Sequence, residues 1–338
     1  MSRIYVHGLG AVSPAGWGVP ALRDALTKGE PIPAKALPRP GWTKPFRVRE
    51  VPPPAQRPAF VAHPRLRRTS PITTHAASAA LEALQSATSR LPAPPARLGL
   101  VMCVNAGCVQ YTERFFREVL QDPLTASPLV FPETVFNAPA SHVACVLTNV
   151  VQVYSVLGDG SAFIHGLSLA ADWLQDGSVD GCLVVGSEEI NWLLVDVVWH
   201  YDHSAEPAGG AGAVYLGTAP SNVELSCITD PMRYSPHLTR RNAVRAMRAA
   251  LPPCQPDELL CDSVRGKCRA SAAELDVWRD WTAARLSPKM ILGEGLIAAA
   301  AWQCVAACDA LSQGCCSAAN VSVVGTEDQA IAARFTHS

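Results

Sequence analysis

The stretch Phe131–Glu189 constrains the fold of this chain more than any other part of the sequence. It holds an apolar run at Val151–Leu157, a tight turn at Gly158–Ser161, a helical pattern over Ala162–Gln175 and a second apolar run at Gly181–Gly186. This order predicts a strand, a sharp turn, a helix and another strand, as in an α/β fold. The turn lies at the positive end of the helix dipole, where many enzymes place a nucleophilic Ser or Cys. The central question is therefore whether a residue of this turn reacts.

The composition excludes several classes of protein. The chain has 338 residues, of which 49% are hydrophobic and 17% are charged, and its formal net charge is −1. A nearly neutral chain lacks the basic footprint of a nucleic-acid-binding protein. No apolar run reaches the ~18 residues of a membrane span. The amino-terminal segment is too short and too interrupted by glycine for a signal peptide, so we expect a cytoplasmic protein.

The twelve cysteines do not indicate a metal site. None forms a Cys-x-x-Cys pair, and Cys304 and Cys308 lie four residues apart in an apolar helical pattern, where cysteine acts as a small hydrophobic residue. His200 and His203 are expected at a polar surface or an interface rather than on a metal. The Gly-x-Gly at residues 8–10 lacks the third glycine of a dinucleotide site. We therefore expect neither a metal nor a cofactor.

Strands and helices alternate along the whole chain, which predicts an α/β protein with parallel-rich sheets between helices. We expect two similar halves, residues 1–217 and 218–338. Residues 8–16 are predicted to form a loop, and the Pro-rich, basic residues 30–70 are predicted to form an irregular arm, either a lid or an interface. The predicted strands are Arg3–His7, Leu98–Val104, Val151–Leu157, Gly181–Gly186, Ala208–Leu216, Val223–Ile228, Leu259–Cys261, Val321–Gly325 and Ala330–Phe335, and the predicted helices are Val19–Lys28, Thr73–Arg90, Tyr111–Leu120, Ala162–Gln175, Thr239–Ala250, Ala272–Ala284 and Leu296–Leu311.

Four passages, in order and at fitting intervals, resemble a known family. They are Val6–Gly18, Phe131–His142, Gly177–Glu188 and Ser287–Ala299. The sequence resembles the β-ketoacyl synthases of fatty-acid and polyketide synthesis, which have the thiolase fold. The resemblance implies two thiolase-like βαβ halves in an αβαβα layering, the second half being shortened. It also implies that Phe131–His142 builds the dimer interface and the acyl pocket.

The catalytic positions of that family are altered in this sequence. Counting from the flanking matches places Gly160 where the family has its acyl-accepting cysteine. Ser263 corresponds to the first catalytic histidine and Glu294 to the second, while the family's lysine is retained as Lys289. The family's Gly-rich gating loop corresponds to residues 324–329. The resemblance therefore implies a ketosynthase-like chain without the ketosynthase catalytic residues.

These replacements remove the chemistry that condensation needs. Decarboxylative condensation uses a thiolate nucleophile, and histidines that donate hydrogen bonds to the enolate oxygen. A carboxylate at Glu294 opposes a developing negative charge, so we expect an ion pair with Lys289 and no condensing activity from this chain alone. Ser161 leaves two interpretations open: a hydroxyl that caps the helix, or a nucleophile next to His165. The i,i+4 spacing of Ser161 and His165 is poor geometry for base activation.

Three functional hypotheses follow. The first is a non-catalytic subunit of the chain-length-factor type, which pairs with an active ketosynthase, shapes its acyl tunnel and meets acyl carrier protein through that complex. The second is an acyl-transferring or hydrolysing enzyme on the same fold that uses Ser161 or another side chain. The third is a non-catalytic homodimer that binds acyl chains. The residues expected at the shared dimer and tunnel wall are Val135, Phe136, Asn137, Ala138 and His142.

Overall fold

One path of hydrogen-bonded strands runs through the whole molecule. The computed structural model describes residues 2–66, 69–91, 93–235, 239–266, 268–326 and 329–338. The strand order is β12-β11-β13-β14-β9-β1-β8-β7-β5-β6. The strands are β1 (Tyr5–Ser13), β2 (Gly16–Trp17), β3 (Lys35–Leu37), β4 (Phe46–Val48), β5 (Leu98–Val104), β6 (Val150–Leu157), β7 (Gly181–Glu188), β8 (Gly210–Gly217), β9 (Val223–Ile228), β10 (Met232–Arg233), β11 (Leu259–Cys261), β12 (Ala284–Leu286), β13 (Ala318–Val324) and β14 (Gln329–His337).

The two ends of this path repeat the same pairing pattern. In the first, β1, β8 and β7 pair antiparallel, and β7, β5 and β6 pair parallel. In the second, β9, β14 and β13 pair antiparallel, and β13, β11 and β12 pair parallel. A short antiparallel contact between β1 and β9 joins the two. The predicted α/β architecture is confirmed, and the boundary at residue 217 stays a prediction.

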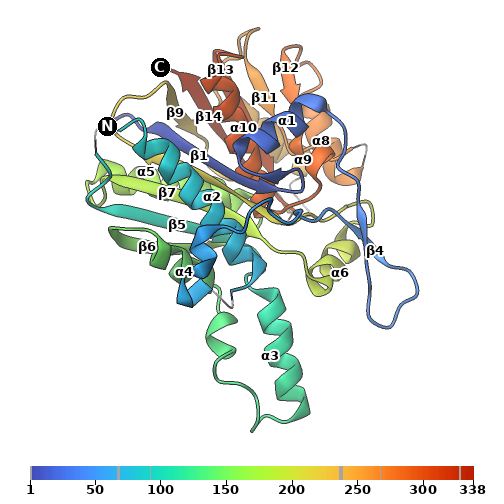
Figure 1. Cartoon of the computed structure of the whole chain (residues 1–338). Coiled ribbons are helices and arrows are strands. Elements are labelled where there is room, and N and C mark those ends of the chain that lie inside the picture. Colours follow the sequence, from blue (N-terminus) through green and yellow to red (C-terminus); the bar gives the residue numbers. More distant parts are fainter. Residues whose placement is uncertain (1, 67–68, 92, 236–238, 267, 327–328) are drawn as a thin grey trace.

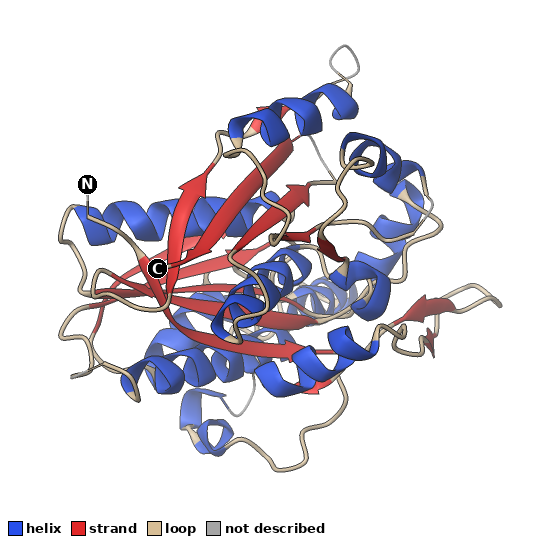
Figure 2. Ribbon diagram, turned by 90° about the horizontal axis from the view of Figure 1, so that it is seen from above, coloured by secondary structure: helices blue, strands red, loops and turns tan. Residues whose placement is uncertain are grey.

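Helices separate and cover the strands, as Figures 1 and 2 show. α5 and α10 lie inside: α10 packs on β7, β8, β13 and β14, and α5 packs on β5, β7 and α10. α2 covers the outer face of β1, β8 and β7, while α7 covers β14. The α-helices are α1 (Val19–Lys28), α2 (Pro71–Thr88), α3 (Val109–Gln121), α4 (Ala138–Val146), α5 (Ser161–Gln175), α6 (Trp192–Tyr201), α7 (Arg240–Ala250), α8 (Arg269–Val277), α9 (Pro288–Leu292) and α10 (Ile297–Ser312), with 3-10 turns η1 (Ala59–Ala62), η2 (Pro64–Leu66) and η3 (Phe131–Glu133).

The expectation of a loop at residues 8–16 is wrong, because β1 continues through two glycines to Ser13. The glycines serve packing rather than a turn. A Cβ atom on Gly8 would lie 1.9 Å from the carbonyl oxygen of Ala83, and one on Gly10 would lie 1.9 Å from that of Ala79. Only a strand without side chains at these positions lets α2 approach this closely.

The arm of residues 30–70 is more ordered than expected. β3 and β4 form an antiparallel hairpin. The Arg39 guanidinium lies 3.9 Å from the ring centre of Trp42 and 4.9 Å from that of Trp199 on α6, and its Nη2 pairs with Asp196 at 2.5 Å. These contacts fasten the hairpin to α6. The helix expected over 272–284 is also corrected: α8 ends at Val277, and β12 begins at Ala284.

We expect the close contact between β1 and α2 to make Gly10 intolerant of a side chain. Gly10→Ala forces the Cβ atom against the Ala79 carbonyl and should lower the free energy of unfolding by about 3 kcal/mol. Gly160→Ala is the control, because the nearest atom to its Cβ is 3.4 Å away. Chemical denaturation of both variants measures the difference, and equal losses would contradict this account.

Candidate functional site

The turn between β6 and α5 has the predicted elbow geometry. Gly158 adopts φ 157°, and Gly160 is the N-cap of α5, with φ −50°. A Cβ atom on Gly160 would touch the Leu296 carbonyl oxygen at 3.4 Å, Val323 Cγ1 at 3.5 Å and Ala300 Cβ at 3.6 Å. The elbow therefore faces the N-terminus of α10 and the end of β13, and its central residue carries no reactive group.

Ser161 is fully buried and held by hydrogen bonds. Its hydroxyl donates to Asp159 Oδ1 at 2.5 Å and accepts from Gln329 Nε2 at 2.6 Å. His165 Nε2 lies 3.4 Å from Gln329 Oε1. The hydroxyl is thus engaged on both sides, and the hydrogen bond of His165 goes to Gln329. This arrangement fits a structural hydroxyl better than an activated nucleophile.

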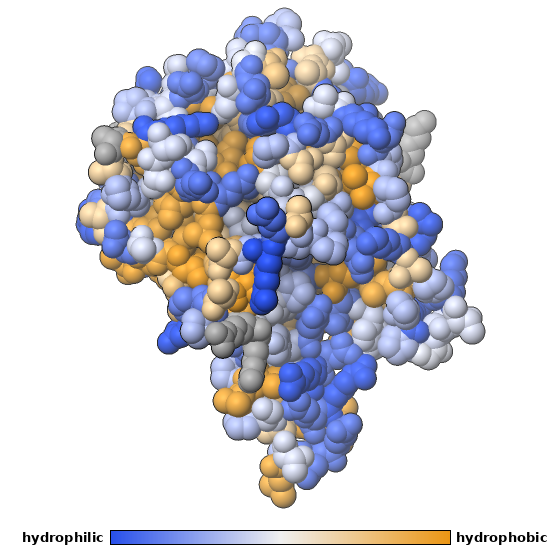
Figure 3. Space-filling model, viewed as in Figure 1, coloured by the Kyte–Doolittle hydropathy of each residue, from blue (hydrophilic) through white to orange (hydrophobic). Residues whose placement is uncertain are grey.

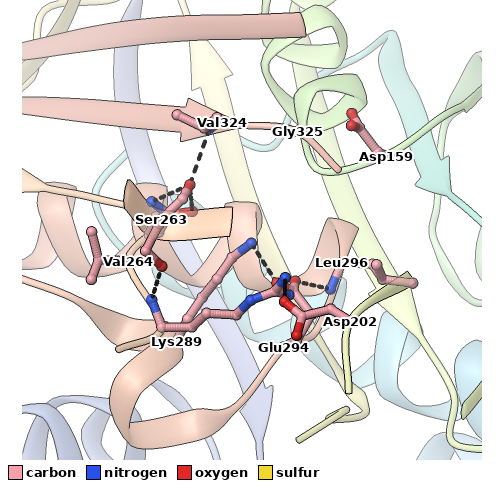
Figure 4. Close-up of polar contacts among 12 residues, drawn as sticks. Asp159, Asp202, Ser263, Val264, Lys289, Glu294, Leu296, Val324 and Gly325 are labelled. Carbon is pink, nitrogen blue, oxygen red and sulfur yellow. Dashed lines mark hydrogen bonds and ion pairs between the residues drawn. The ribbon is translucent and has the colours of Figure 1, made fainter. Parts of the chain in front are cut away.

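Ser263 lies at the end of β11 and is tied to the neighbouring strand. Its Oγ donates to the Ser322 carbonyl at 3.0 Å and accepts from the backbone N–H of Val324 at 3.2 Å. The backbone N–H of Ser263 itself donates to Glu274 Oε1 at 3.3 Å. Both hydrogen bonds of the hydroxyl are therefore made with β13, so the Ser263 O–H is not directed toward the elbow (Figure 4).

Four charged side chains meet beside the elbow. Glu294 Oε2 accepts from Lys289 Nζ at 2.9 Å and from Arg265 Nη1 at 2.7 Å, and Arg265 Nη2 pairs with Asp202. Glu294 Oε1 accepts from the backbone N–H of Leu296 at 3.0 Å. Figure 4 shows Lys289, Glu294 and Asp202 converging. The expected Lys289–Glu294 pair is present, and we call the four residues the ion cluster.

The ion cluster has no net charge, and two of its members, Glu294 and Lys289, are buried. The Glu294 side chain is 2% exposed and that of Lys289 is 7% exposed. Burial raises the pKa of Glu294, but the positive charges of Lys289 and Arg265 outweigh it, so the pKa lies below its ordinary value. An ionised carboxylate only accepts hydrogen bonds. The cluster therefore offers no donor for an enolate oxygen at position 294.

Arg265 and Asp202 were missed at the sequence level. Arg265 stands two residues after Ser263, and Asp202 follows α6. The sequence predicts one cation, Lys289, beside Glu294, and no local pattern signals a second cation there. Only the fold brings these two residues to Glu294.

The arm and the loop after β13 close the site. Arg49 Nη1 donates to the carbonyls of Met290 at 3.1 Å and Ile291 at 2.7 Å. On the other side, a Cβ atom on Gly325 would lie 1.9 Å from Asp159 Oδ2, so this glycine lets the loop approach the elbow. Residues 327–328 of the expected gating loop lie outside the described residues, as do Arg67 and Arg68 of the basic arm.

Two buried carboxyl groups, Glu188 and Glu189, lie at the end of β7. Glu188 Oε1 accepts from the backbone N–H of Asn105, and Glu189 Oε1 accepts from that of Gln110 at 2.7 Å. Glu189 Oε2 contacts Ser70 Oγ, at the start of α2. Burial raises the pKa of Glu188 to about 8 and that of Glu189 to about 7. The pair fixes the loop before α3 to the sheet.

The residues expected at the dimer wall lie between η3 and α4. Val135, Phe136 and Asn137 are exposed, and His142 contacts Glu133 at 2.8 Å. Ala138 is buried in the core of this chain, so the first three residues, rather than Ala138, present side chains to the surroundings. No partner chain is part of the structure, so their role at a wall stays a prediction.

A larger apolar surface than expected adjoins these residues. The apolar run of β6 looks like a buried strand in sequence, yet its side chains are largely exposed, with Val151 57% and Tyr154 56% accessible. β6 ends the strand path, and among the described strands it pairs only with β5. Figure 3 shows apolar surface on the flank where β6 and α4 lie and at the tip of the segment around α3. Exposed apolar side chains there are Phe116, Leu120, Leu124, Leu129, Phe131, Val135, Phe136, Val151, Val153, Tyr154 and Leu157.

In the part of the chain that the structure describes, no helix is long and apolar enough to span a membrane. Within the same residues, no group of three or more His, Cys, Asp or Glu side chains is arranged to hold a metal ion.

Substitutions at Lys289 and Glu294 should have non-additive effects on the free energy of unfolding, because the two side chains form one ion pair. Lys289→Met leaves Glu294 buried with one cation fewer and should lower the free energy of unfolding by about 3 kcal/mol. The double variant Lys289→Met/Glu294→Gln should lose less than the two single losses added together, because it removes both charges. Lys28→Met is the control: its pair with Glu30 is exposed and should contribute less than about 1 kcal/mol. Strictly additive losses in chemical denaturation would contradict the coupling.

Glu188 and Glu189, at the end of β7, should make the free energy of unfolding fall as pH rises. The folded-state pKa values of about 8 and about 7 exceed the ordinary glutamate value of 4.5, so the native state holds protons that the unfolded chain has released. Stability present below about pH 4.5 is therefore lost progressively up to about pH 8, by at most about 1.4 kcal/mol per pH unit for each group. Glu188→Gln should flatten this slope, whereas Glu30→Gln, at an exposed position, should not. Identical slopes in parent and Glu188→Gln unfolding curves would refute the prediction.

Comparison with known proteins rests on structure. No family model matches the sequence, and no curated protein matches it. Among solved structures, the ishigamide ketosynthase/chain length factor superposes with a TM-score of 0.80 at 18% identity, covering 99% of both chains. A β-ketoacyl synthase from Burkholderia phymatum gives 0.79 at 16% identity, covering 100% of both. AntDE:AntF, a type II polyketide synthase acyl-carrier protein in complex with its ketosynthase, gives 0.79 at 15%, covering 100% of this chain and 99% of that one.

These identities are low, and what they establish is the architecture. The superpositions extend over essentially the whole chain, so both halves and the elbow between β6 and α5 have counterparts in the matched structures. The expected thiolase-like architecture is confirmed: this chain has the fold of the β-ketoacyl synthases.

Proposed function

We propose that this chain is a non-catalytic ketosynthase-like subunit of the chain-length-factor type. In this proposal it pairs with a catalytically complete ketosynthase and forms part of the wall of that enzyme's acyl tunnel. Acyl carrier protein meets the chain through the complex, in fatty-acid-like or polyketide-like biosynthesis. Two of the matched structures support a chain-length-factor role over other roles of the fold. One is the ishigamide ketosynthase/chain length factor, and the other, AntDE:AntF, is a carrier protein in complex with its ketosynthase.

The observation that carries the proposal is the exposed edge at β6. An unpaired edge strand with apolar side chains is a template for another strand, and proteins that remain monomeric usually protect such edges. Here Val151, Val153, Tyr154 and Leu157 are all exposed along one strand. Burying apolar surface of this kind against a second chain is favourable by roughly 25 cal/mol per Å².

The chemistry of the elbow supports a partner that is itself active. Gly160 has no nucleophile, Ser263 is engaged by β13, and Glu294 is neutralised within the ion cluster. A chain that keeps the architecture and loses these groups still provides a complementary surface. The active ketosynthase supplies the thiolate and the hydrogen-bond donors, and this chain supplies apolar side chains such as Phe136 at the shared wall.

Pairing is tested by coexpression with the ketosynthase encoded beside this chain. We expect one heterodimer by size-exclusion chromatography and native mass spectrometry. Val153→Arg places a charge on the exposed face of β6 and should abolish the heterodimer. Val197→Arg is the matched control, since Val197 is also exposed, at 54% against 42% for Val153, but lies on α6, far from β6 (Figure 1).

Three outcomes would contradict the proposal. One is a chain that stays monomeric, or forms only homodimers, in the presence of the ketosynthase. Another is loss of pairing in Val197→Arg together with Val153→Arg. The third is a covalent acyl adduct on Ser161 after incubation with an acyl thioester, detected by intact-mass spectrometry, which would favour the enzymatic alternative.

A further inference from the structure

The exposed face of α7 carries a concentration of positive charge that does not stabilise the helix itself. Its buried residues are Ala243, Val244 and Met247, and the opposite face presents Arg241, Arg245 and Arg248 in one stripe along the helix axis. Like charges three or four residues apart destabilise a helix, and a cation in the first turn opposes the helix dipole. Arg241 and Arg248 form ion pairs with Asp276 and Asp280, whereas Arg245 forms no ion pair within the part of the chain that the structure describes.

Two of these arginines are paired with carboxylates at and just after the end of α8. Arg241 Nε donates to Asp276 Oδ2 at 2.6 Å. Arg248 Nη1 pairs with Asp280 at 2.5 Å, and its guanidinium lies 4.6 Å from the ring centre of Trp278. Guanidinium groups fixed in this way lose little freedom when they bind a further group.

Two other arginines in the same place lack a carboxylate partner. Among the residues that the structure describes, Arg245 makes one weak contact with Asn242 at 3.4 Å, and Arg279 has no carboxylate within ion-pair distance. Arg279 is exposed, two residues after the end of α8, and lines the same cleft as Arg241 and Arg245. The ion pairs therefore neutralise only part of the positive charge here.

These side chains surround a cleft between α7 and the end of α8. Its volume is about 330 Å³, and its lining consists of Arg241, Arg245, Arg248, Asp276, Val277, Arg279 and Asp280. Four arginines and two aspartates leave a net charge of +2 in the cleft. The elbow and the β6 edge lie on other elements, so this cleft belongs to neither site described above.

We propose that the cleft between α7 and α8 binds a diphosphate group. A single carboxylate neutralises one charge, whereas a diphosphate supplies at least two negative charges in one small group. Guanidinium forks match phosphate oxygens with two parallel hydrogen bonds, which is why arginine predominates where phosphate is recognised. Arg245 and Arg279 make these contacts, and Arg241 and Arg248 add positive potential from fixed positions. This inference does not depend on the proposed pairing with a ketosynthase.

Isothermal titration calorimetry with inorganic pyrophosphate tests the site. The parent chain should bind pyrophosphate, and Arg245→Ala/Arg279→Ala should bind it at least about tenfold more weakly, because charge-assisted hydrogen bonds are lost. The matched control Arg57→Ala/Arg90→Ala removes two exposed arginines elsewhere and should bind as the parent does. Affinity should fall steeply when NaCl is raised from about 0.05 M to about 0.3 M. The four substituted residues are all exposed, so thermal unfolding should show both double variants folded; they are Arg57, Arg90, Arg245 and Arg279.

A second arm with ADP distinguishes the source of the diphosphate. Equal affinity for ADP and pyrophosphate supports recognition of the diphosphate alone, and tighter binding of ADP supports a nucleotide. The inference is overturned if neither compound binds at about 10 mM, a concentration that would reveal even a weak site. It is also overturned if Arg245→Ala/Arg279→Ala binds as well as the parent, or if the control loses affinity equally.

Discussion

The enclosure of two helices between strand layers determines the arrangement of everything else. α10 is almost entirely buried, and it packs on strands from both ends of the path as well as on α5. Because neither helix can shift without opening the core, their N-termini are fixed next to each other, with the Leu296 carbonyl 3.4 Å from the Cβ position of Gly160. Close packing of this kind persists through changes in chemistry, since it depends on volume and not on reactive groups. The elbow therefore keeps its shape although its central residue is glycine.

Charge neutrality explains the composition of the space beside the elbow. A carboxylate at position 294 is costly in a buried place unless cations compensate it. Lys289 alone gives one such cation, and Arg265, which also pairs with Asp202, gives a second. The carboxylate at 294 is thus linked to charges that come from α9, from the loop after β11 and from the loop after α6. The four residues form one electrostatic unit, so a change in any of them alters the balance for the other three.

The sequence was informative wherever a pattern repeats locally, and uninformative wherever contacts join distant segments. The strand, turn and helix around Gly160 follow from hydrophobic periodicity, and the Lys289–Glu294 pair follows from proximity along the chain. The glycines of β1 resemble a loop, because their purpose is the approach of α2, which no local pattern reveals. The apolar run of β6 resembles a buried strand, because an exposed apolar edge and a core strand have the same composition. Arg265 and Asp202 are 63 positions apart, so only the fold brings them together.

The position of β1 has a consequence for how the chain acquires its structure during synthesis. β1 is made long before its two long partners, β8 and β9, where Tyr5 pairs with Gly217 and Glu224. At a typical elongation rate of 5–20 residues per second, roughly 10–40 s pass before these partners exist. During that interval β1 has only the two-residue strand β2 beside it, and non-local pairing of this kind is slow to form. The apolar residues of β1 therefore remain open to contacts with other chains until β8 is made, and aggregation competes with folding in that period.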